Sequence, residues 1–431
     1  MAFVRLSDIR PLVSKKVGRF YSGTANASDN TTTAMKDDDL GPYPNDFFNR
    51  LWFMVTSGTN DGVIRQVDDW VLSTLLVSWT TALPNAAQQS ITYEIHQYEP
   101  GWVLDAIADA VRNMYPSLAR ETFVPVGVGG SPLSNPSMEF FASTGVPLEW
   151  STGATAARSP ISWRSPSAVA LSTTTSTLQY PNSTPIIEEV MRPLIGKSIT
   201  VYAMSQSGTA SQSRLRVTID GTNTDGSYNT GTGRYEKLSV TVSVSDPSDL
   251  PVIHLVYDSN ATTAYWDTVW IDGATTDRIY IPRHIFPDGP SHLYAESAQP
   301  DDVSGGQLVP LSGWKYGRTE LAGVDTSYDY ISPGARWAGH VLWARGLSPL
   351  SVPTSQTDTT TYVELTADEV RLLVVEAALV LLDRAKGAAP TSAHIALEAK
   401  RIDLLREKRA LEGGFSSPAL SADLPSVWGR R

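Results

Sequence analysis

The sequence predicts a mainly β protein of the α+β class, in which a helical bundle carries a small β-barrel and a jelly-roll β-sandwich as insertions. The chain of 431 residues is 41% hydrophobic and 18% charged, which suits several packed cores. Its 12 Trp, 17 Tyr and 10 Phe residues, with runs of Thr and Ser, favour strands. Short alternating segments lie in the middle of the chain, whereas helical periodicity occurs towards both ends.

Four segments have apolar residues at the three- and four-residue spacing of amphipathic helices. Residues 3–13 form the first, and Pro11 is expected to end or kink it. Residues 102–115 form the second, a third begins at the capping residue Thr366, and the fourth covers residues 394–411. Because each has one apolar face, we expect the four helices to pack as one bundle, with β-elements inserted between them.

Two stretches contain short strands separated by turn residues. The first predicts a small antiparallel barrel, and its strands are residues 51–56, 62–67, 74–79 and 92–96. The second predicts a sandwich of jelly-roll type, and its strands are residues 198–204, 214–220, 237–243, 252–258 and 265–271. Residues 123–181 are rich in Gly, Pro, Ser and Thr and are expected to form loops and irregular strands.

These elements divide the chain into six successive segments. They are an N-terminal helix and arm (1–36), the small β-barrel (37–99), a bundle helix (100–120), the β-sandwich insertion with its loops (121–361), the C-terminal helices of the bundle (362–411) and a C-terminal tail (412–431).

Composition excludes several kinds of chemistry and partner. The absence of cysteine excludes disulfides, thiolate metal sites and cysteine nucleophiles. No stretch has the length and apolar character of a secretory signal or membrane span, so we expect a soluble protein made in the cytoplasm, with no membrane partner. The net charge of -11 argues against a protein that coats nucleic acid over its whole surface.

Two local basic faces are expected despite the negative net charge of the chain. The first consists of Arg5, Arg10, Lys15, Lys16, Arg19 and Lys36, and the second of Lys400, Arg401, Arg406, Lys408 and Arg409. Such faces could contact DNA phosphates without reading sequence, bind an acidic protein surface, or only solvate a helix.

No pattern predicts a catalytic, cofactor or metal site, so we expect no enzyme activity, cofactor or metal. The six histidines lack metal-ligand spacing, although His284 and His292 lie near Asp288; they are His96, His254, His284, His292, His340 and His394. The adjacent pair Glu188 and Glu189 would point to opposite faces of a strand, unlike paired glycosidase carboxylates.

Three further motifs have a structural alternative. The segment from Asp220 to Gly226 is similar to a calcium loop that could use Asp220 or Asp225, but Gly231 stands where the bidentate Glu is required, which favours a turn. Residues 127–130 are Gly-rich but lack the helix and Lys of a phosphate loop. Trp266 and Trp270, four residues apart on one strand, could form a stacking platform or belong to a core or a subunit contact.

Residues 36–94 contain a series of short motifs. They are Asp37-Asp38-Asp39-Leu40, Asp46-Phe47-Phe48-Asn49, Val55-Thr56-Ser57-Gly58-Thr59, Arg65-Gln66-Val67 and Tyr93-Glu94. In this arrangement the segment resembles phage virion proteins encoded near the portal. With residues 1–120 and the C-terminal helices, the pattern looks like an elaborated head-to-tail adaptor. Such adaptors form twelve-fold rings under the portal.

The middle of the chain departs from a minimal adaptor. The strand Tyr265-Trp266-Asp267-Thr268-Val269-Trp270-Ile271 looks similar to the last strands of carbohydrate-binding-module jelly rolls, which often decorate phage particles.

The resemblance implies a virion structural protein at the head-tail interface. It would form a dodecameric adaptor ring that joins the portal protein to a tail or nozzle protein, with the C-terminal tail inserted into a neighbour or the portal clip. Genomic DNA would pass through the ring without sequence-specific contacts. The alternative is a phage tail or fibre-associated subunit that binds host surface glycans through its β-sandwich.

Overall fold

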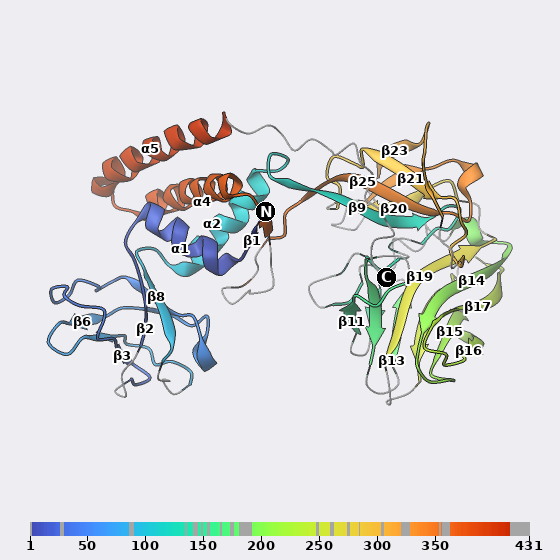
Figure 1. The fold of residues 1–431 in the computed structure, drawn as a ribbon, viewed down its shortest axis with the longest axis horizontal. Coiled ribbons are helices and arrows are strands. Elements are labelled where there is room, and N and C mark those ends of the chain that lie inside the picture. The colour runs from blue at the N-terminus through green and yellow to red at the C-terminus, as the bar shows by residue number, and fades with distance from the viewer. Residues whose placement is uncertain are drawn as a thin grey trace. The chain divides into compact units, whose positions relative to one another are not determined.

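A computed structural model describes the chain over most of its length. The described residues are 2–25, 30–85, 90–133, 135, 137–139, 141, 145–147, 150–152, 156–163, 166–172, 176–180, 192–246, 250–258, 263–273, 276–283, 285–302, 306–319, 328–352, 355 and 363–413. The chain is mainly β, and its paired strands are antiparallel. It divides into two compact units (Figure 1): unit 1 combines residues 1–120 with 349–431, and unit 2 comprises residues 121–348. The finer division into six segments stays a prediction.

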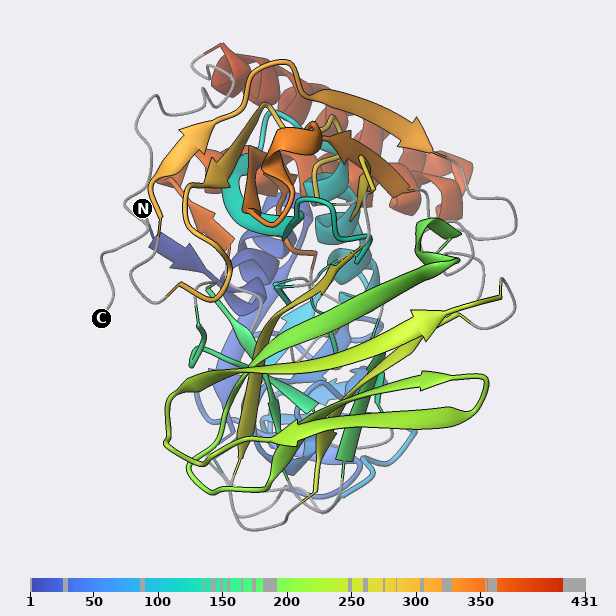
Figure 2. The same cartoon turned by 90° about the vertical axis from the view of Figure 1, so that its right-hand side faces the viewer.

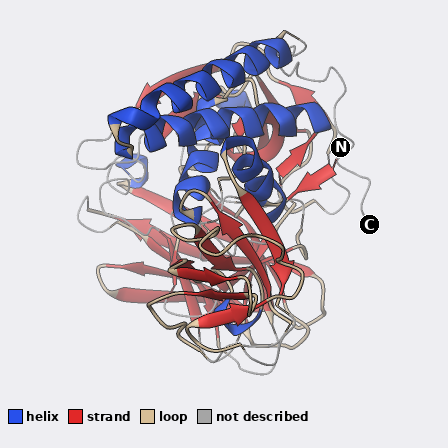
Figure 3. Ribbon diagram, turned by 90° about the vertical axis from the view of Figure 1, so that its left-hand side faces the viewer, coloured by secondary structure: helices blue, strands red, loops and turns tan. Residues whose placement is uncertain are grey.

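The described residues of unit 1 form four α-helices, α1 (Leu6–Val17), α2 (Pro100–Asn113), α4 (Ala367–Ala388) and α5 (His394–Glu412). Helix α4 packs against the other three, and α5 lies alongside it (Figure 3). The capping prediction at Thr366 is confirmed, because its Oγ1 accepts from the backbone N–H of Glu369 at 3.3 Å. The helices share their apolar core with Leu350 and Leu365, which lie outside them, and the predicted all-helical bundle stays a prediction.

The first helix differs from the prediction at both ends. Residues 2–4 form strand β1 (Ala2–Val4), which pairs with β26 (Val363–Leu365), so the helix begins only at residue 6. Pro11 does not end it, and α1 continues to residue 17. Pro11 removes one helical hydrogen bond, whereas the fully buried side chains of Val13 and Val17 hold the following turns in the core.

The predicted small barrel is wrong, because the strands of this region form two open sheets. One has the order β2 (Phe20–Thr24), β8 (Thr92–His96), β4 (Trp52–Val55) and β5 (Ile64–Gln66), and the other β3 (Ala34–Lys36), β7 (Leu76–Ser78) and β6 (Asp69–Val71). The two sheets share no strand, so the strands do not close into one barrel. The sheets instead enclose an aromatic core with Phe48, Phe53 and Trp70.

Unit 2 contains the predicted sandwich of jelly-roll type, which is confirmed. One sheet has the order β10 (Ser151–Thr152), β13 (Ser176–Tyr180), β18 (Val252–Tyr257), β15 (Ser213–Ile219) and β16 (Thr222–Tyr228). The other has the order β11 (Ala156–Ser159), β12 (Ala168–Leu171), β19 (Ala264–Asp272), β14 (Lys197–Gln206) and β17 (Tyr235–Val244). Figure 2 shows the long strands of residues 197–244 in green.

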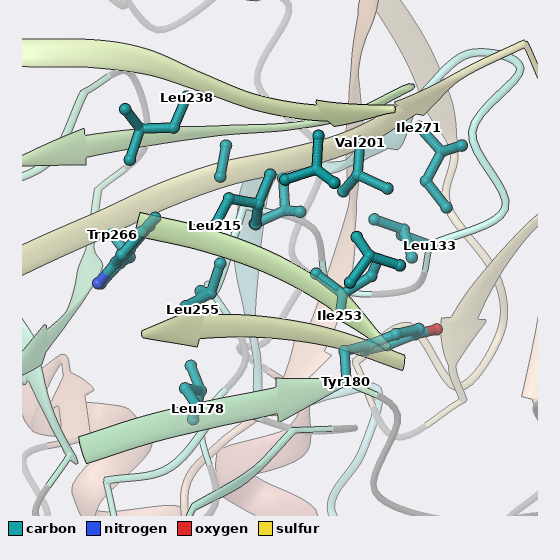
Figure 4. Packing of buried hydrophobic residues seen from close by; sticks show 14 of the residues in the cluster. Leu133, Leu178, Tyr180, Val201, Leu215, Leu238, Ile253, Leu255, Trp266 and Ile271 are labelled. Carbon is teal, nitrogen blue, oxygen red and sulfur yellow. The ribbon is translucent and has the colours of Figure 1, made fainter. Parts of the chain in front are cut away.

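Alternating apolar side chains from both sheets fill the space between them (Figure 4). Val201, Leu238 and Ile271 come from one sheet, and Leu178, Leu215 and Leu255 from the other. At 25 cal/mol per Å² of buried apolar surface, each such side chain contributes about 1.5–3 kcal/mol. The side chains that alternate with them point to the opposite face of each sheet.

Beyond the sandwich, unit 2 contains a second pair of small sheets. Their strand orders are β22 (Leu308–Pro310), β21 (His292–Glu296), β25 (Val341–Pro349), β9 (Ala119–Val128), and β20 (Ile279–Pro282), β24 (Tyr328–Ser332), β23 (Lys315–Thr319). The expectation that residues 123–181 form only loops and irregular strands is therefore wrong, since β9 and β10 to β13 are regular strands. Their partners lie far along the chain, so local sequence carries little signal for them.

Among the described residues, no helix has both the length and the apolar character needed to cross a membrane.

Candidate functional site

A charged and hydrogen-bonded surface covers part of the sandwich, and we call it the polar face. It comprises Arg214, Arg216, Thr218, Asn223, Asp225, Tyr228, His254 and Asp258. Leu215 and Val217 on β15 point into the core and are fully buried. Because side chains alternate along a strand, Arg214, Arg216 and Thr218 lie on the outer side of the sheet.

A two-residue turn brings β16 beside β15. Asp220 and Gly221 have positive φ values of 46° and 71°, and Ile219 pairs with Thr222 across them. This is the backbone of a tight hairpin turn, in which Asp-Gly is a favoured pair. The predicted turn is therefore confirmed at this point, and the segment of the calcium-loop alternative continues as strand β16.

An irregularity in the pairing of β15 with β16 gathers the charged groups. Arg214 pairs with Tyr228 and Arg216 with Asp225, so β16 has one extra residue between these two pairs. Gly226 lies in this bulge, and a Cβ there would stand 2.5 Å from the carbonyl oxygen of Ser239 on β17. Glycine thus allows the bulged strand to approach the other sheet closely.

Asp225 binds both arginines. Its Oδ1 lies 2.5 Å from Arg216 Nε, while its Oδ2 accepts from Arg216 Nη2 at 3.1 Å and from Arg214 Nη1 at 2.8 Å. The hydrogen bond from Arg216 and the positive charge of both arginines hold the pKa of Asp225 below its usual value. Asp225 is therefore ionised at neutral pH.

A second carboxylate lies beside the first. Arg214 Nε is 2.9 Å from Asp258 Oδ2 as an ion pair, without the alignment of a hydrogen bond. The same oxygen accepts from the Tyr228 hydroxyl at 2.9 Å. Burial and the hydrogen bond to Asp258 raise the pKa of Tyr228, so its hydroxyl remains a donor.

The third part of the polar face fixes the protonation of His254. The Thr218 hydroxyl donates to Asn223 Oδ1 at 2.6 Å and lies 2.9 Å from His254 Nε2. A hydroxyl has one proton, so His254 Nε2 must donate to Thr218 and Nδ1 is left as an acceptor. Burial and the neighbouring Arg216 lower the pKa of His254, which favours this neutral form.

Tyr228 adds an aromatic surface. The Arg214 guanidinium lies over the ring at 5.0 Å from its centroid, while 38% of the residue is exposed. The ring is held by Arg214 and by its hydroxyl, so little freedom is lost when a ligand stacks on its exposed part. Together the polar face offers donors, acceptors and one ring to a flat polar ligand.

The stacking-platform alternative for Trp266 and Trp270 is excluded, because a bulge in the strand places them on opposite sides. Ala203 pairs with Val269 but Met204 with Asp267, so Thr268 is an extra residue, with a φ of 38°. Trp266 therefore points into the sandwich core, where it is fully buried. Trp270 points to the opposite side and stacks on Tyr202 with 5.1 Å between the ring centroids. The core alternative is correct for Trp266.

The calcium alternative at Asp220 and Asp225 also finds no support. Asp225 is engaged by two arginines, which disfavour a divalent cation at the same oxygens. Within the described part of the chain, no cluster of three or more acidic or histidine side chains has the arrangement of a metal site.

Each described histidine contacts a different set of partners. His96 belongs to the buried network of unit 1, and His254 to the polar face. Of the others, His292 bonds Ser291 at 3.0 Å, His340 bonds the Glu296 carbonyl at 2.7 Å and His394 bonds the Ala389 carbonyl at 3.1 Å. His284, Glu188 and Glu189 lie outside the described residues.

The Gly-rich residues 127–130 have a packing role. A Cβ on Gly127 would lie 2.7 Å from the Ile279 side chain, and one on Gly129 would lie 1.9 Å from the Trp337 carbonyl oxygen. Close approach of neighbouring chain segments explains both glycines.

Many side chains of the predicted basic faces pair within unit 1. Lys16 binds Glu407 at 2.7 Å, Arg401 binds Asp383 at 2.7 Å and Lys408 binds Glu376 at 2.8 Å. The acidic partners come from distant parts of the sequence, which explains why the faces look unopposed when the sequence is read locally. Alternatives that need exposed positive charge on these faces therefore lose support.

Unit 1 contains a Ser-His-Glu arrangement that the sequence does not reveal. Ser14 Oγ lies 2.8 Å from His96 Nδ1, and His96 Nε2 lies 2.9 Å from Glu94 Oε2. Arg10 also binds Glu94, through Nε at 2.7 Å and Nη2 at 3.1 Å. All four residues are at most 7% exposed, so no substrate reaches the serine. We assign the network to the core between α1 and β8.

Comparison with known proteins assigns the chain to no family. No family model matches it, and no curated protein matches it. Among solved structures, an enzymatically active domain of the bacteriophage CBA120 tailspike protein 4 shares 9% identity at a TM-score of 0.26, covering 33% of this chain but only 21% of that one.

Two solved carbohydrate-binding modules are also similar to part of the chain. The xylan-binding domain CBM22-1 of Paenibacillus barcinonensis Xyn10C shares 11% identity at a TM-score of 0.27, covering 35% of this chain and 99% of that one. TmCBM61 in complex with β-1,4-galactotriose shares 12% identity at a TM-score of 0.25, covering 33% of this chain and 97% of that one. The sandwich is thus established by its own strand pairing rather than by these likenesses.

The buried network predicts that Arg10→Ala strongly lowers the free energy of unfolding of unit 1. Removing Arg10 leaves Glu94 as a poorly compensated buried charge, which costs about 3–5 kcal/mol. The matched control is Arg406→Ala, since Arg406 and its partner Asp403 are both exposed and such pairs contribute about 0–1 kcal/mol. Urea unfolding followed by amide exchange in α1 and β8 measures both. Equal effects of the two substitutions would contradict the assignment.

The same network predicts that acid destabilises unit 1. Burial would raise the pKa of Glu94, but hydrogen bonds from His96 and Arg10 outweigh it and lower that pKa, while burial lowers the pKa of His96. Both groups bind protons more readily when unfolded, so their contribution is present above the unfolded pKa values and is lost as pH falls. Amide exchange of β8 should accelerate, beyond its intrinsic pH dependence, from below about pH 6.5. Constant protection down to pH 4 would contradict this.

Proposed function

We propose that the chain is a non-catalytic glycan-binding protein of a phage tail, and that its β-sandwich binds surface polysaccharide through the polar face. The observation that carries the proposal is the array around Asp225, in which two arginines, two carboxylates, an imidazole and a tyrosine ring share one side of one sheet. The place on a phage tail rests on the sequence resemblance.

The array suits the chemistry of sugars. A sugar hydroxyl both donates and accepts hydrogen bonds, and the polar face offers donors on Arg216 and Asn223 and acceptors on Asp258 and His254. The side chains are already held by one another, which reduces the entropy lost on binding. The exposed part of the Tyr228 ring can pack against the apolar face of a sugar ring.

The charges of the polar face support binding without hydrolysis. A glycosidase requires a pair of carboxyl groups, one of which has a raised pKa and acts as the acid. Asp225 is instead bound to two arginines and its pKa is lowered, while Asp258 pairs with Arg214. Together with the sealed Ser14, this supports the proposal that the chain is not an enzyme.

The adaptor ring predicted from the sequence resemblance has less support. In such a ring the basic faces would contact DNA or the portal, and much of their charge is paired within unit 1. We therefore place glycan binding ahead of it.

Tyr228→Ala is expected to weaken glycan binding at least about ten-fold, through loss of the stacking ring and of its bond to Asp258. Binding is measured with the full chain on an array of bacterial surface polysaccharides and then by calorimetry. Tyr228→Phe keeps the ring and should retain most of the affinity.

The matched control is Thr241→Ala on β17, an exposed strand position on the other sheet. It should leave binding unchanged. Equal binding by Tyr228→Ala and the wild type, with the fold intact by circular dichroism, would overturn the proposed site.

A further inference from the structure

We infer that the ligand of the polar face is a neutral polysaccharide rather than an acidic one. The inference rests on the proposed function and names the class of glycan that this site selects. It follows from the ion pairs within the site, because both arginines already bind carboxylates of this chain. In arginine-rich sites that recognise ligand carboxylates or phosphates, the guanidinium groups are available to the ligand.

The charges of the polar face cancel. Arg214 and Arg216 provide two positive charges, and Asp225 and Asp258 provide two negative ones at 2.5–2.9 Å from their nearest guanidinium nitrogens. Burial, and after it the positive charge of Arg216, lowers the pKa of His254, which favours its neutral form. A ligand therefore meets a surface of alternating sign with no net charge.

The two arginines already use much of the guanidinium surface that an acidic sugar would need. Two-pronged binding of a carboxylate uses two parallel N–H groups of one arginine, on its Nε–Nη2 edge or at its Nη1–Nη2 end. On Arg216 the Nε–Nη2 edge is taken, because both atoms already donate to Asp225. On Arg214, Nε faces Asp258 and Nη1 donates to Asp225. A ligand carboxylate would have to displace an internal carboxylate or lie next to it.

The repulsion between a ligand carboxylate and a neighbouring aspartate of the site can be estimated. Two like charges about 4 Å apart repel by roughly 1 kcal/mol in water and about 4 kcal/mol at the effective dielectric near a protein surface. A hydroxyl carries no such penalty and can share the oxygens of Asp258 and the remaining N–H groups of both arginines. Neutral sugars are thereby favoured over acidic ones with the same backbone.

The test compares matched polymers. Hyaluronan, alginate and polygalacturonate are each paired with their carboxyl-reduced form, and neutral glucans and galactans are included in the same panel. The full chain should bind neutral members, and within any pair that it recognises it should prefer the neutral member by at least about ten-fold. Its affinity should change little between about 0.05 and 0.5 M NaCl, since no net charge is neutralised.

A variant sharpens the test. Asp225→Asn removes one negative charge and frees the two parallel N–H groups of Arg216, so it should gain about ten-fold in affinity for the acidic member of a pair. The control is Asp301→Asn, which makes the same charge change at the ion pair with Lys237 on the other sheet and should show no gain.

The outcomes separate the two claims. Tighter binding of acidic polymers by the wild type, or an affinity that falls steeply with salt, would overturn the neutral-ligand inference and leave glycan binding in place. If no member of the panel binds, or if Tyr228→Ala binds as well as the wild type, the proposed function fails and this inference fails with it.

Discussion

The polar face depends on one carboxylate. Asp225 accepts hydrogen bonds from both Arg214 and Arg216, and without it two guanidinium groups would repel each other across one strand. The Arg214 guanidinium lies over the Tyr228 ring, and Asp258 accepts a hydrogen bond from the hydroxyl of the same tyrosine. Asp225 thus positions the two arginines, and Arg214 in turn positions Tyr228. Each of these side chains is bound by at least one other.

Two bulges decide what each face of the sandwich can do. The bulge at Thr268 sends Trp266 into the core and Trp270 outwards, so two aromatic residues that share a face in a regular strand are separated. The irregularity between β15 and β16 has the opposite effect, because it brings Asp225 into reach of two arginines. In both strands one extra residue reverses the side to which the following side chains point.

Much of the fold could be predicted from the sequence, because strong periodicity identifies α4, α5, β14, β15 and β17 to β19. Short strands such as β3, β6 and β10 were missed, since their stability comes from partners far along the chain rather than from their own residues. The barrel prediction failed for a related reason: sequence shows strands and turns but not whether a sheet closes.

The site was only partly visible in the sequence. Arg214 and Arg216 alternate with Leu215 and Val217, a pattern that places both arginines on one outer face. Asp225 was noticed only as an element of a calcium loop, because its role depends on a hairpin register that the sequence does not fix. The ion pairs of Arg10, Lys16 and Lys408 cannot be seen in the sequence for the same reason, since their partners lie more than 30 residues away.

If polysaccharide binds the outer side of the sheet that contains β15, β16 and β18, the bound ligand should protect these strands. Amide hydrogen exchange of the full chain with and without a neutral polysaccharide measures this protection. Exchange should slow in the three strands and stay unchanged in β14 and β17. Protection confined to β14, β17 and β19, or to unit 1, would contradict this expectation.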